Sequence, residues 1–254
     1  MIPLRIATLN IRNLADRWDE RLPLLLADMA ALQPDLMGLQ EVVYPLQQDR
    51  LIGAAGARRY EAHRGWAGRP EYGNAILVAD GLEFADVERL ELGLNRSALR
   101  GIVTTTAGTL LMTVTHLHHL TADEAERDEQ VAQLLAWLDG GRATDAQVVV
   151  GDFNAEPDEP AAGRMRDAGF RSAFDEANGS DPDVTWPSGL QAPAMDTEGP
   201  PGCLDYIWLR GDIRVAASRL VFDRPAVGDE TLYPSDHLGI VAELEVGSAD
   251  PARG

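Results

Sequence analysis

The chain has 254 residues, of which 45% are hydrophobic, so it can bury a sizeable core, and this composition argues against wholesale disorder. Its 22 basic and 41 acidic residues give a formal net charge of -19. That charge repels polyanions at long range and disfavours tight non-specific binding to duplex nucleic acid. The single cysteine, Cys203, excludes an internal disulfide.

The chain carries no pattern typical of a membrane protein. No segment approaches the roughly 20 consecutive apolar residues that a membrane span needs, and the first residues lack a signal-like pattern. We therefore expect a cytoplasmic protein, with a monomer as the default oligomeric state. Because no linker-like stretch separates two halves, we predict a single domain over residues 1–246 and a flexible tail over residues 247–254.

Hydrophobic periodicity predicts alternating strands and a few helices in chain order. The expected elements are a strand at 5–9, a helix at 21–32, strands at 36–39, 75–78, 101–106 and 110–115, a helix at 122–138, a strand at 147–150, a helix at 160–168, and strands at 206–209 and 240–246. Strands outnumber helices and the helices are scattered, which favours two packed sheets with helices outside them. The apolar stripe of the helix at 122–138 would leave Arg127 and Gln130 exposed.

Residues 178–202 are rich in Pro, Gly and Ser and lack periodicity. Loops of this length inside a compact domain are often functional. Trp186 lies in this loop, where it could stack on a substrate group or only anchor the loop.

Polar side chains stand at the ends of several predicted strands. They are Asn10, Gln40 and Glu41, His116, Asp152 and Asn154, Asp205, and Asp236 and His237. Strand ends are rigid mounts, so these side chains could converge on one cleft at one edge of the sheets. Their oxygen-rich set suits Mg²⁺ or Mn²⁺, whereas zinc favours clusters of His and Cys.

Each of these patterns has a simpler interpretation when it is taken alone. Asp152-Phe-Asn154 is typical of a turn with side-chain-to-backbone hydrogen bonds. Asp236-His237 could be a helix cap or a solvated pair, and Glu41 an ordinary charge at a strand end. His118 could line the same cleft as His116, although nearby residues on a strand alternate between its faces.

Seven motifs in order resemble the signature of the endonuclease/exonuclease/phosphatase superfamily, whose members include DNase I-like nucleases. They span almost the whole chain: Thr-Leu-Asn10-Ile-Arg, Leu-Gln-Glu41-Val, Tyr-Gly-Asn74-Ala-Ile, Thr-His116-Leu, Gly-Asp152-Phe-Asn154, Leu-Asp205-Tyr-Ile and Ser-Asp236-His237. The resemblance implies an α/β (α+β) fold, a four-layer αββα sandwich of two mostly antiparallel sheets flanked by helices. It also implies a site at the edge of the sheets.

The resemblance further implies roles for individual residues. Glu41 would be the principal metal ligand with Asn10 beside it, and the full set of candidate ligands is Asn10, Glu41, Asp152, Asn154, Asp236 and His237. The candidate catalytic residues are His116, Asp152, Asn154, Asp205, Asp236 and His237, with His237 oriented by Asp205 or Asp236. Candidate substrate-binding residues are Arg12, Asn74, Arg100 and Trp186, and Arg96 is a further arginine that could clamp a phosphate.

We therefore expect a phosphoester hydrolase that depends on Mg²⁺ or Mn²⁺. The acidic net charge and the lack of a basic stripe favour a small or lipid-like phosphoester over polymeric nucleic acid as its substrate. The alternatives are an endonuclease or exonuclease with the same site and, third, a binding module that has lost catalysis. The third alternative is the weakest, because every signature position carries a competent residue.

Overall fold

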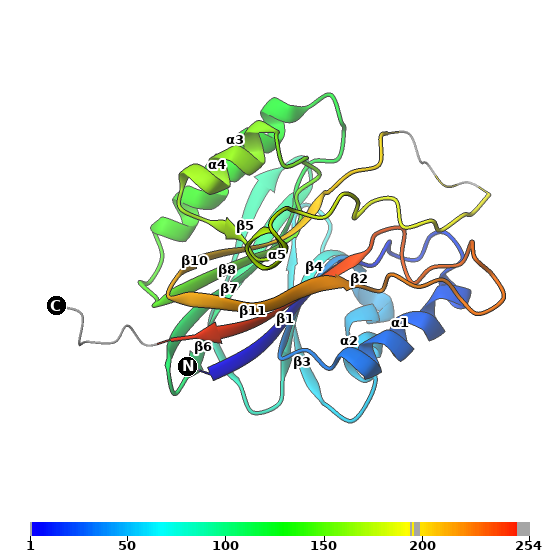
Figure 1. Cartoon of the computed structure of the whole chain (residues 1–254), viewed down its shortest axis with the longest axis horizontal. Helices are drawn as coiled ribbons and strands as arrows, with labels where there is room; N and C mark the ends of the chain where they lie inside the picture. Colours follow the sequence, from blue (N-terminus) through cyan, green and yellow to red (C-terminus); the bar gives the residue numbers. More distant parts are fainter. Residues whose placement is uncertain (1, 194, 196–198, 248–254) are drawn as a thin grey trace.

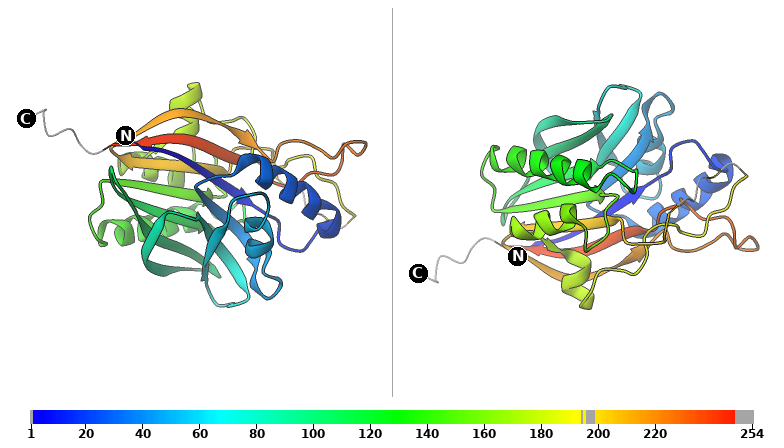
Figure 2. Two further views of the ribbon diagram at one scale, coloured as in Figure 1. Left: turned by 90° about the horizontal axis from the view of Figure 1, so that it is seen from below. Right: turned by 90° about the horizontal axis from the view of Figure 1, so that it is seen from above.

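The computed structural model describes residues 2–193, 195 and 199–247. The predicted flexible tail therefore lies, apart from Gly247, outside the described residues. The described chain forms two six-stranded sheets that pack face to face and carry helices on their outer faces (Figures 1 and 2). The αββα sandwich predicted from the sequence is confirmed.

The first sheet has the strand order β11-β12-β1-β2-β4-β3. Its strands are β1 (Ile2–Asn10), β2 (Leu36–Val43), β3 (Tyr60–Trp66), β4 (Tyr72–Ala79), β11 (Ile213–Val221) and β12 (Gly239–Val246). Only the pairing of β1 with β2 is parallel. Its outer face carries α1 (Trp18–Leu32), the short 3₁₀ helix η1 (Tyr44–Leu46) and α2 (Gln48–Gly53).

The second sheet has the order β5-β6-β7-β8-β10-β9. Its strands are β5 (Glu83–Gly93), β6 (Arg96–Thr105), β7 (Gly108–His116), β8 (Ala146–Asp152), β9 (Arg171–Ser172) and β10 (Asp205–Gly211). Here only β7 and β8 run parallel. The helices are α3 (Glu124–Asp139), α4 (Pro160–Asp167) and α5 (Ala173–Asn178), and α3 and α4 cover the outer face of this sheet.

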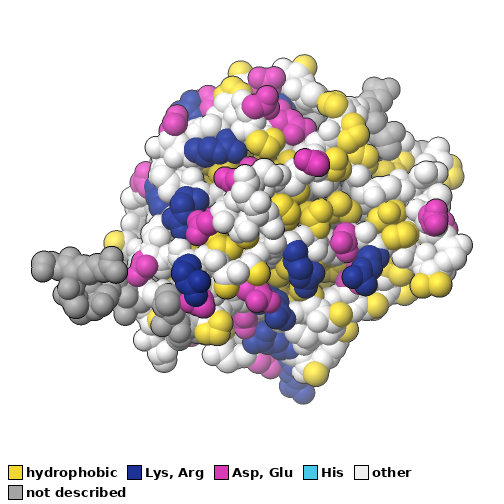
Figure 3. Space-filling model, viewed as in Figure 1, with side chains coloured by type: hydrophobic (Ala, Val, Ile, Leu, Met, Phe, Trp, Pro, Cys, Tyr) yellow, Lys and Arg dark blue, Asp and Glu magenta, His cyan; other side chains and the backbone are white. Residues whose placement is uncertain are grey.

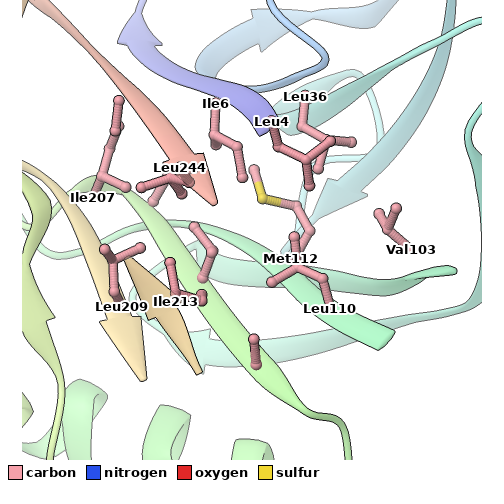
Figure 4. Close-up of a cluster of buried hydrophobic side chains, with 14 of the residues drawn as sticks. Leu4, Ile6, Leu36, Val103, Leu110, Met112, Ile207, Leu209, Ile213 and Leu244 are labelled. Atoms are coloured by element: carbon pink, nitrogen blue, oxygen red, sulfur yellow. The ribbon is translucent and has the colours of Figure 1, made fainter. Parts of the chain in front are cut away.

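Three apolar clusters hold the four layers together. The central cluster lies between the sheets, where Leu4 and Ile6 of β1 meet Met112 of β7 and Leu209 of β10 (Figure 4). A second cluster lies under α3 and α4, and a third lies under α1 and α2. Because each sheet is apolar on both faces, only the edges and ends of the strands are left for polar chemistry.

The two parallel pairs determine where the polar strand ends lie. Asn10 at the end of β1 stands opposite Gln40 of β2, and His116 at the end of β7 stands opposite Asp152 at the end of β8. The antiparallel strand β10 begins at Asp205, also opposite Asp152. The sheet registers therefore bring the ends of five strands to one edge of the sandwich.

Several elements escaped prediction from the sequence. The edge strand β5 is mostly exposed, and bulges interrupt its pairing with β6, so it lacks a clean alternation of apolar and polar residues. Strand β11 also contains an irregularity in its register, and β9 has two residues. The prediction that Arg127 and Gln130 are exposed is wrong, because both are buried in α3. Arg127 donates to Glu159 and to two carbonyl groups of the preceding loop.

The surface of the described residues shows no large basic region in the view of Figure 3, where arginine and acidic side chains are interspersed. All 22 basic residues are arginines, because the sequence contains no lysine. The described residues include no helix long and apolar enough to cross a membrane.

Candidate active site

A cleft of about 450 Å³ lies at the edge where the strand ends meet. Its lining includes nine of the residues selected from the sequence: Asn10, Arg12, Glu41, His116, Asp152, Asn154, Trp186, Asp236 and His237. A tenth, Asp205, is buried behind His237 and does not line the cleft. The structure thus brings together side chains that are separated by more than two hundred positions in the sequence.

Asp152 lies at the centre of this cleft and is 1% exposed. Its Oδ2 accepts a hydrogen bond of 2.9 Å from Asn10 Nδ2, and its Oδ1 accepts one of 3.0 Å from the backbone N–H of Asn154. Burial raises the pKa of Asp152 to about 7. Gly151, just before it, has φ 150°, and a Cβ atom there would lie 2.0 Å from the carbonyl oxygen of Thr115.

His237 and Asp205 form a buried pair beside Asp152. The Nδ1 atom of His237 lies 2.9 Å from Asp205 Oδ2, and its Nε2 atom lies 3.7 Å from Asp152 Oδ2. Burial lowers the pKa of His237, but the carboxylates of Asp205, Asp152 and Asp236 outweigh this effect and raise it to about 10. Asp205 therefore fixes the orientation of the imidazole ring and directs its other nitrogen toward Asp152.

The loop that carries His237 is tied to β1. The hydroxyl of Ser235 donates to the carbonyl of Asn10 at 2.6 Å. The buried guanidinium of Arg21, in α1, donates to the carbonyls of Ile11 and Pro234 at 2.9 Å each. These bonds satisfy loop carbonyls that would otherwise be buried without partners, so Arg21 acts as a positioning residue for both segments.

Glu41 reaches the cleft because strand β2 is irregular at this residue. Its backbone has φ 61°, and the pairing of β2 with β4 shifts register between Leu39 and Val42. Its Oε2 accepts a hydrogen bond of 2.6 Å from Asn13 Nδ2, and Asn10 Nδ2 lies 3.4 Å from its Oε1. Left-handed backbone at a non-glycine residue is costly and is found where surrounding structure enforces it, commonly at functional sites.

His116 contacts both Asp152 and an arginine. Its Nε2 lies 3.4 Å from Asp152 Oδ2 and 2.8 Å from Nη1 of Arg96. Burial, together with the positive charge of Arg96, lowers the pKa of His116 well below its usual value. The imidazole is therefore neutral at physiological pH.

Three candidates lie outside the cleft. Arg100 is bound to Glu88 at 2.9 Å and to the carbonyl of Trp137, so we no longer count it as a substrate-binding residue. Asn74 is buried and donates to the carbonyl of Ser97 at 2.8 Å, a bond that links the two sheets beside the cleft. His118 pairs with Asp123 at 2.8 Å and does not line the cleft.

The remaining two substrate-binding candidates do line the cleft. Arg12 is held by Asp16 at 2.7 Å, and its Nη1 lies 3.5 Å from Asp236. Trp186 lies where the long loop forms an isolated bridge between Trp186 and Gly202. Its role in substrate binding stays a prediction.

The structure adds lining residues that the sequence did not select as site residues, among them Asn13, Tyr72, His119 and Glu156, and it also places Arg96 in the lining. Tyr72 stands two positions before Asn74 in a motif already recognised, and its pKa is raised by burial and by neighbouring Glu41. Arg96 was named from the sequence as an arginine that could clamp a phosphate, but it was not counted among the substrate-binding candidates with Arg12 and Arg100. No sequence signal distinguished Asn13.

The buried acidic centre fits a divalent cation. One ligand atom each from Asp152, Asp205 and His237 lie within 4.8 Å of one another. The Oδ1 atom of Asp205 is buried and has no hydrogen-bond partner among the described residues. Buried carboxylates that lack sufficient partners are costly, and a hard cation relieves that cost. Glu41 and Asn10 offer further oxygens at the same cleft.

Comparison with known proteins supports these observations. The model of the endonuclease/exonuclease/phosphatase family matches residues 7–237. Nocturnin from Xenopus laevis is 25% identical over 266 residues, which cover 93% of this chain and 67% of that protein. Nocturnin from Homo sapiens is 26% identical over 259 residues, which cover 90% of this chain and 58% of that protein. The chain thus spans between 58% and 67% of the length of these relatives.

Solved structures share the fold. The human Nocturnin catalytic domain with bound sulfate anion has a TM-score of 0.74 at 24% identity and covers 96% of this chain and 94% of that one. TDP2 from D. rerio, complexed with single strand DNA product, has a TM-score of 0.78 at 18% identity and covers 97% and 100%. An endonuclease/exonuclease/phosphatase from Bacteroides vulgatus has a TM-score of 0.78 at 21% identity with the same coverage.

Proposed function

Because this chain belongs to the endonuclease/exonuclease/phosphatase family, we propose that it is a divalent-metal-dependent nuclease that hydrolyses phosphodiester bonds in single-stranded nucleic acid. Membership of the family makes it a metal-dependent hydrolase of phosphoester bonds. The choice of nucleic acid as substrate and of Mg²⁺ or Mn²⁺ as the ion belongs to the proposal.

The preference for a small or lipid-like phosphoester over polymeric nucleic acid, which the net charge suggested, is wrong. TDP2, which shares this fold over 97% of the chain, is complexed with single strand DNA product. An acidic protein can still admit a polyanion where local charge differs from net charge, and this cleft contains Arg12 and Arg96. The acidic surface continues to argue against tight duplex binding.

One observation carries the proposal: Asp152, Asp205 and His237 form a buried cluster at an open cleft, where Asp152 and His237 line the cleft and Asp205 lies behind His237. Buried carboxylates are costly, and Asp205 Oδ1 has no hydrogen-bond partner among the described residues, so the burial of this cluster at the meeting point of five strands needs a compensating role. A divalent ion held there would neutralise the non-bridging oxygens of a phosphate and stabilise the leaving oxygen.

The protein's own groups would then place the reacting atoms. Asp152 Oδ2 and His237 Nε2 are 3.7 Å apart, so a single water molecule can contact both, and one of the two groups would take its proton. Asp205 keeps the ring of His237 in the required orientation. The Asn154 side chain is held by the carbonyl of Leu117 at 3.1 Å beside this position.

A substrate panel tests this function. With Mg²⁺ or Mn²⁺ present, we expect turnover of single-stranded DNA or RNA oligonucleotides well above that of sphingomyelin or inositol phosphates. It should also exceed that of duplex plasmid, because the acidic net charge disfavours tight duplex binding. Product sizes on denaturing gels measure the cleavage. Turnover of sphingomyelin or an inositol phosphate with none of oligonucleotides would contradict the proposal.

A further inference from the structure

We propose that Arg96 forms a second phosphate-binding subsite, which takes the phosphate next to the one that is hydrolysed. This inference rests on the nuclease function proposed above and adds to it a preference for substrates with two neighbouring phosphates. It concerns a residue that is separate from the carboxylates and His237 on the floor of the cleft.

The backbone fixes Arg96 at the rim of the cleft. Arg96 is the first residue of β6 and follows a two-residue turn in which Leu94 and Asn95 have φ 49° and 58°. Two left-handed residues in succession form the tight hairpin turn whose twist matches that of the flanking strands. Pairing of Gly93 with Arg96 closes this hairpin, so the arginine stands on a rigid element.

The guanidinium group of Arg96 contacts imidazoles instead of carboxylates. Its Nη1 lies 2.8 Å from Nε2 of His116, and its Nη2 lies 3.0 Å from Nδ1 of His119. Among the residues that the structure describes, no carboxylate lies within ion-pairing distance of Arg96.

Arg12 provides the contrast within the same cleft. Its guanidinium is bound to Asp16 at 2.7 Å and lies 3.5 Å from Asp236, so two carboxylates compensate its charge. The charge of Arg96 is not compensated in this way by any described residue. An uncompensated arginine in a partly enclosed cleft attracts phosphate, and its planar fork can bind two phosphate oxygens at once.

His116 links this subsite to the hydrolytic centre. Its Nε2 atom lies 3.4 Å from Asp152 Oδ2 and 2.8 Å from Arg96 Nη1, and Nη1 also lies 3.0 Å from its Nδ1, so the guanidinium stands against the ring close to the catalytic carboxylate without pairing with it. A phosphate on the floor of the cleft would contact Asn154 and His237, and the next phosphate along the strand would reach Arg96. A substrate with only the scissile phosphate would leave Arg96 without an anion.

Three thymidine dinucleotides test the subsite. TpT carries only the scissile phosphate, pTpT adds a 5′-phosphate and TpTp adds a 3′-phosphate. We expect the wild-type enzyme to hydrolyse at least one of the two phosphorylated dinucleotides with kcat/KM about 10- to 100-fold above that of TpT, the range for hydrogen bonds to a charged group. Arg96→Gln should abolish this preference, mainly through KM, so that the ratio of kcat/KM between the phosphorylated dinucleotides and TpT falls to about one.

Two further variants serve as controls. Arg96→Lys keeps the charge but lacks the fork, so it should retain part of the preference. Arg142→Gln removes an arginine whose side chain is 67% exposed and pairs with Asp86 outside the cleft, and it should behave as wild type. Melting curves show whether each variant folds.

Equal rates on all three dinucleotides, or an equal loss on all three in Arg96→Gln, would overturn the subsite while the nuclease function stands. If none is hydrolysed, calorimetric binding of the same dinucleotides decides the inference separately, and the proposed function fails only if longer oligonucleotides are not cleaved either. Tighter binding of pTpT or TpTp than of TpT to the wild type, lost in Arg96→Gln, supports it. Equal dissociation constants refute it.

Discussion

Replacing Asp205 by Asn is expected to lower kcat on a single-stranded oligonucleotide by about 10²- to 10⁴-fold, the range for removing a positioned acid, base or electrostatic contact. The reason is that Asp205 orients His237 through the 2.9 Å contact. Asp152→Asn and His237→Ala should each cause a loss in the same range. Single-turnover rates at saturating substrate measure the chemical step.

Because these three residues act on one water and one phosphate, their effects should not add. The double variant of Asp152→Asn and His237→Ala should lose little more than the worse single variant. Asp123→Asn is the matched control, since Asp123 pairs with His118 at 2.8 Å in another Asp-His pair outside the cleft. Folded variants of Asp152, Asp205 and His237 with near-wild-type kcat would show that the buried cluster is not catalytic.

Chelation with EDTA is expected to abolish turnover, and added Mg²⁺ or Mn²⁺ should restore it. The physical reason is that Asp152, Asp205 and Glu41 repel a phosphate unless a cation screens them. Titration of the stripped enzyme with each metal, with oligonucleotide cleavage as readout, measures the apparent affinity.

Glu41→Gln should raise the metal concentration needed for half-maximal rate, because the substitution removes a carboxylate that faces the cleft but keeps its size. The hydrogen bond from Asn13 can be retained, so the fold should survive. Full activity in excess EDTA would refute the metal requirement. A variant that titrates like the wild type would remove Glu41 from the ligands.

The fold and the position of the cleft could be predicted from the sequence because apolar strand runs, and the polar residues at their ends, are local patterns. Short β-branched runs identify buried strands such as β8, and a polar residue directly after such a run marks its end. Asp152, Asn10 and His116 follow this rule. The resemblance carried by the seven motifs in order further implied two packed sheets with a site at their edge, which no single motif could.

Long side chains were harder to place. Arg96 and Arg100 lie on the same face of β6, where residues two apart share a face, so alternation could not separate them. Their positions along the strand distinguish them. At about 3.3 Å per residue, Arg100 lies about 13 Å farther along β6 than Arg96, where its guanidinium packs against the ring of Trp137. Arg127 and Gln130 are buried because their side chains form hydrogen bonds with backbone groups. The apolar stripe of the helix does not reveal these bonds.

The error over the substrate has a similar origin. Net charge describes the field far from the protein, whereas the cleft presents a particular arrangement of Arg96, neutral His116 and buried acids. That arrangement depends on which arginines already have carboxylate partners, and this information exists only in three dimensions.

Anomalous diffraction from crystals soaked with Mn²⁺ and a short single-stranded oligonucleotide would locate both the metal and the strand. We expect a manganese peak in the cleft, bonded to a carboxylate oxygen of Glu41 or Asp152 and to a phosphate of the strand beside His237. Manganese bound only outside the cleft would contradict this expectation. So would a strand bound away from Asp152 and His237, when the enzyme is active in the same solution.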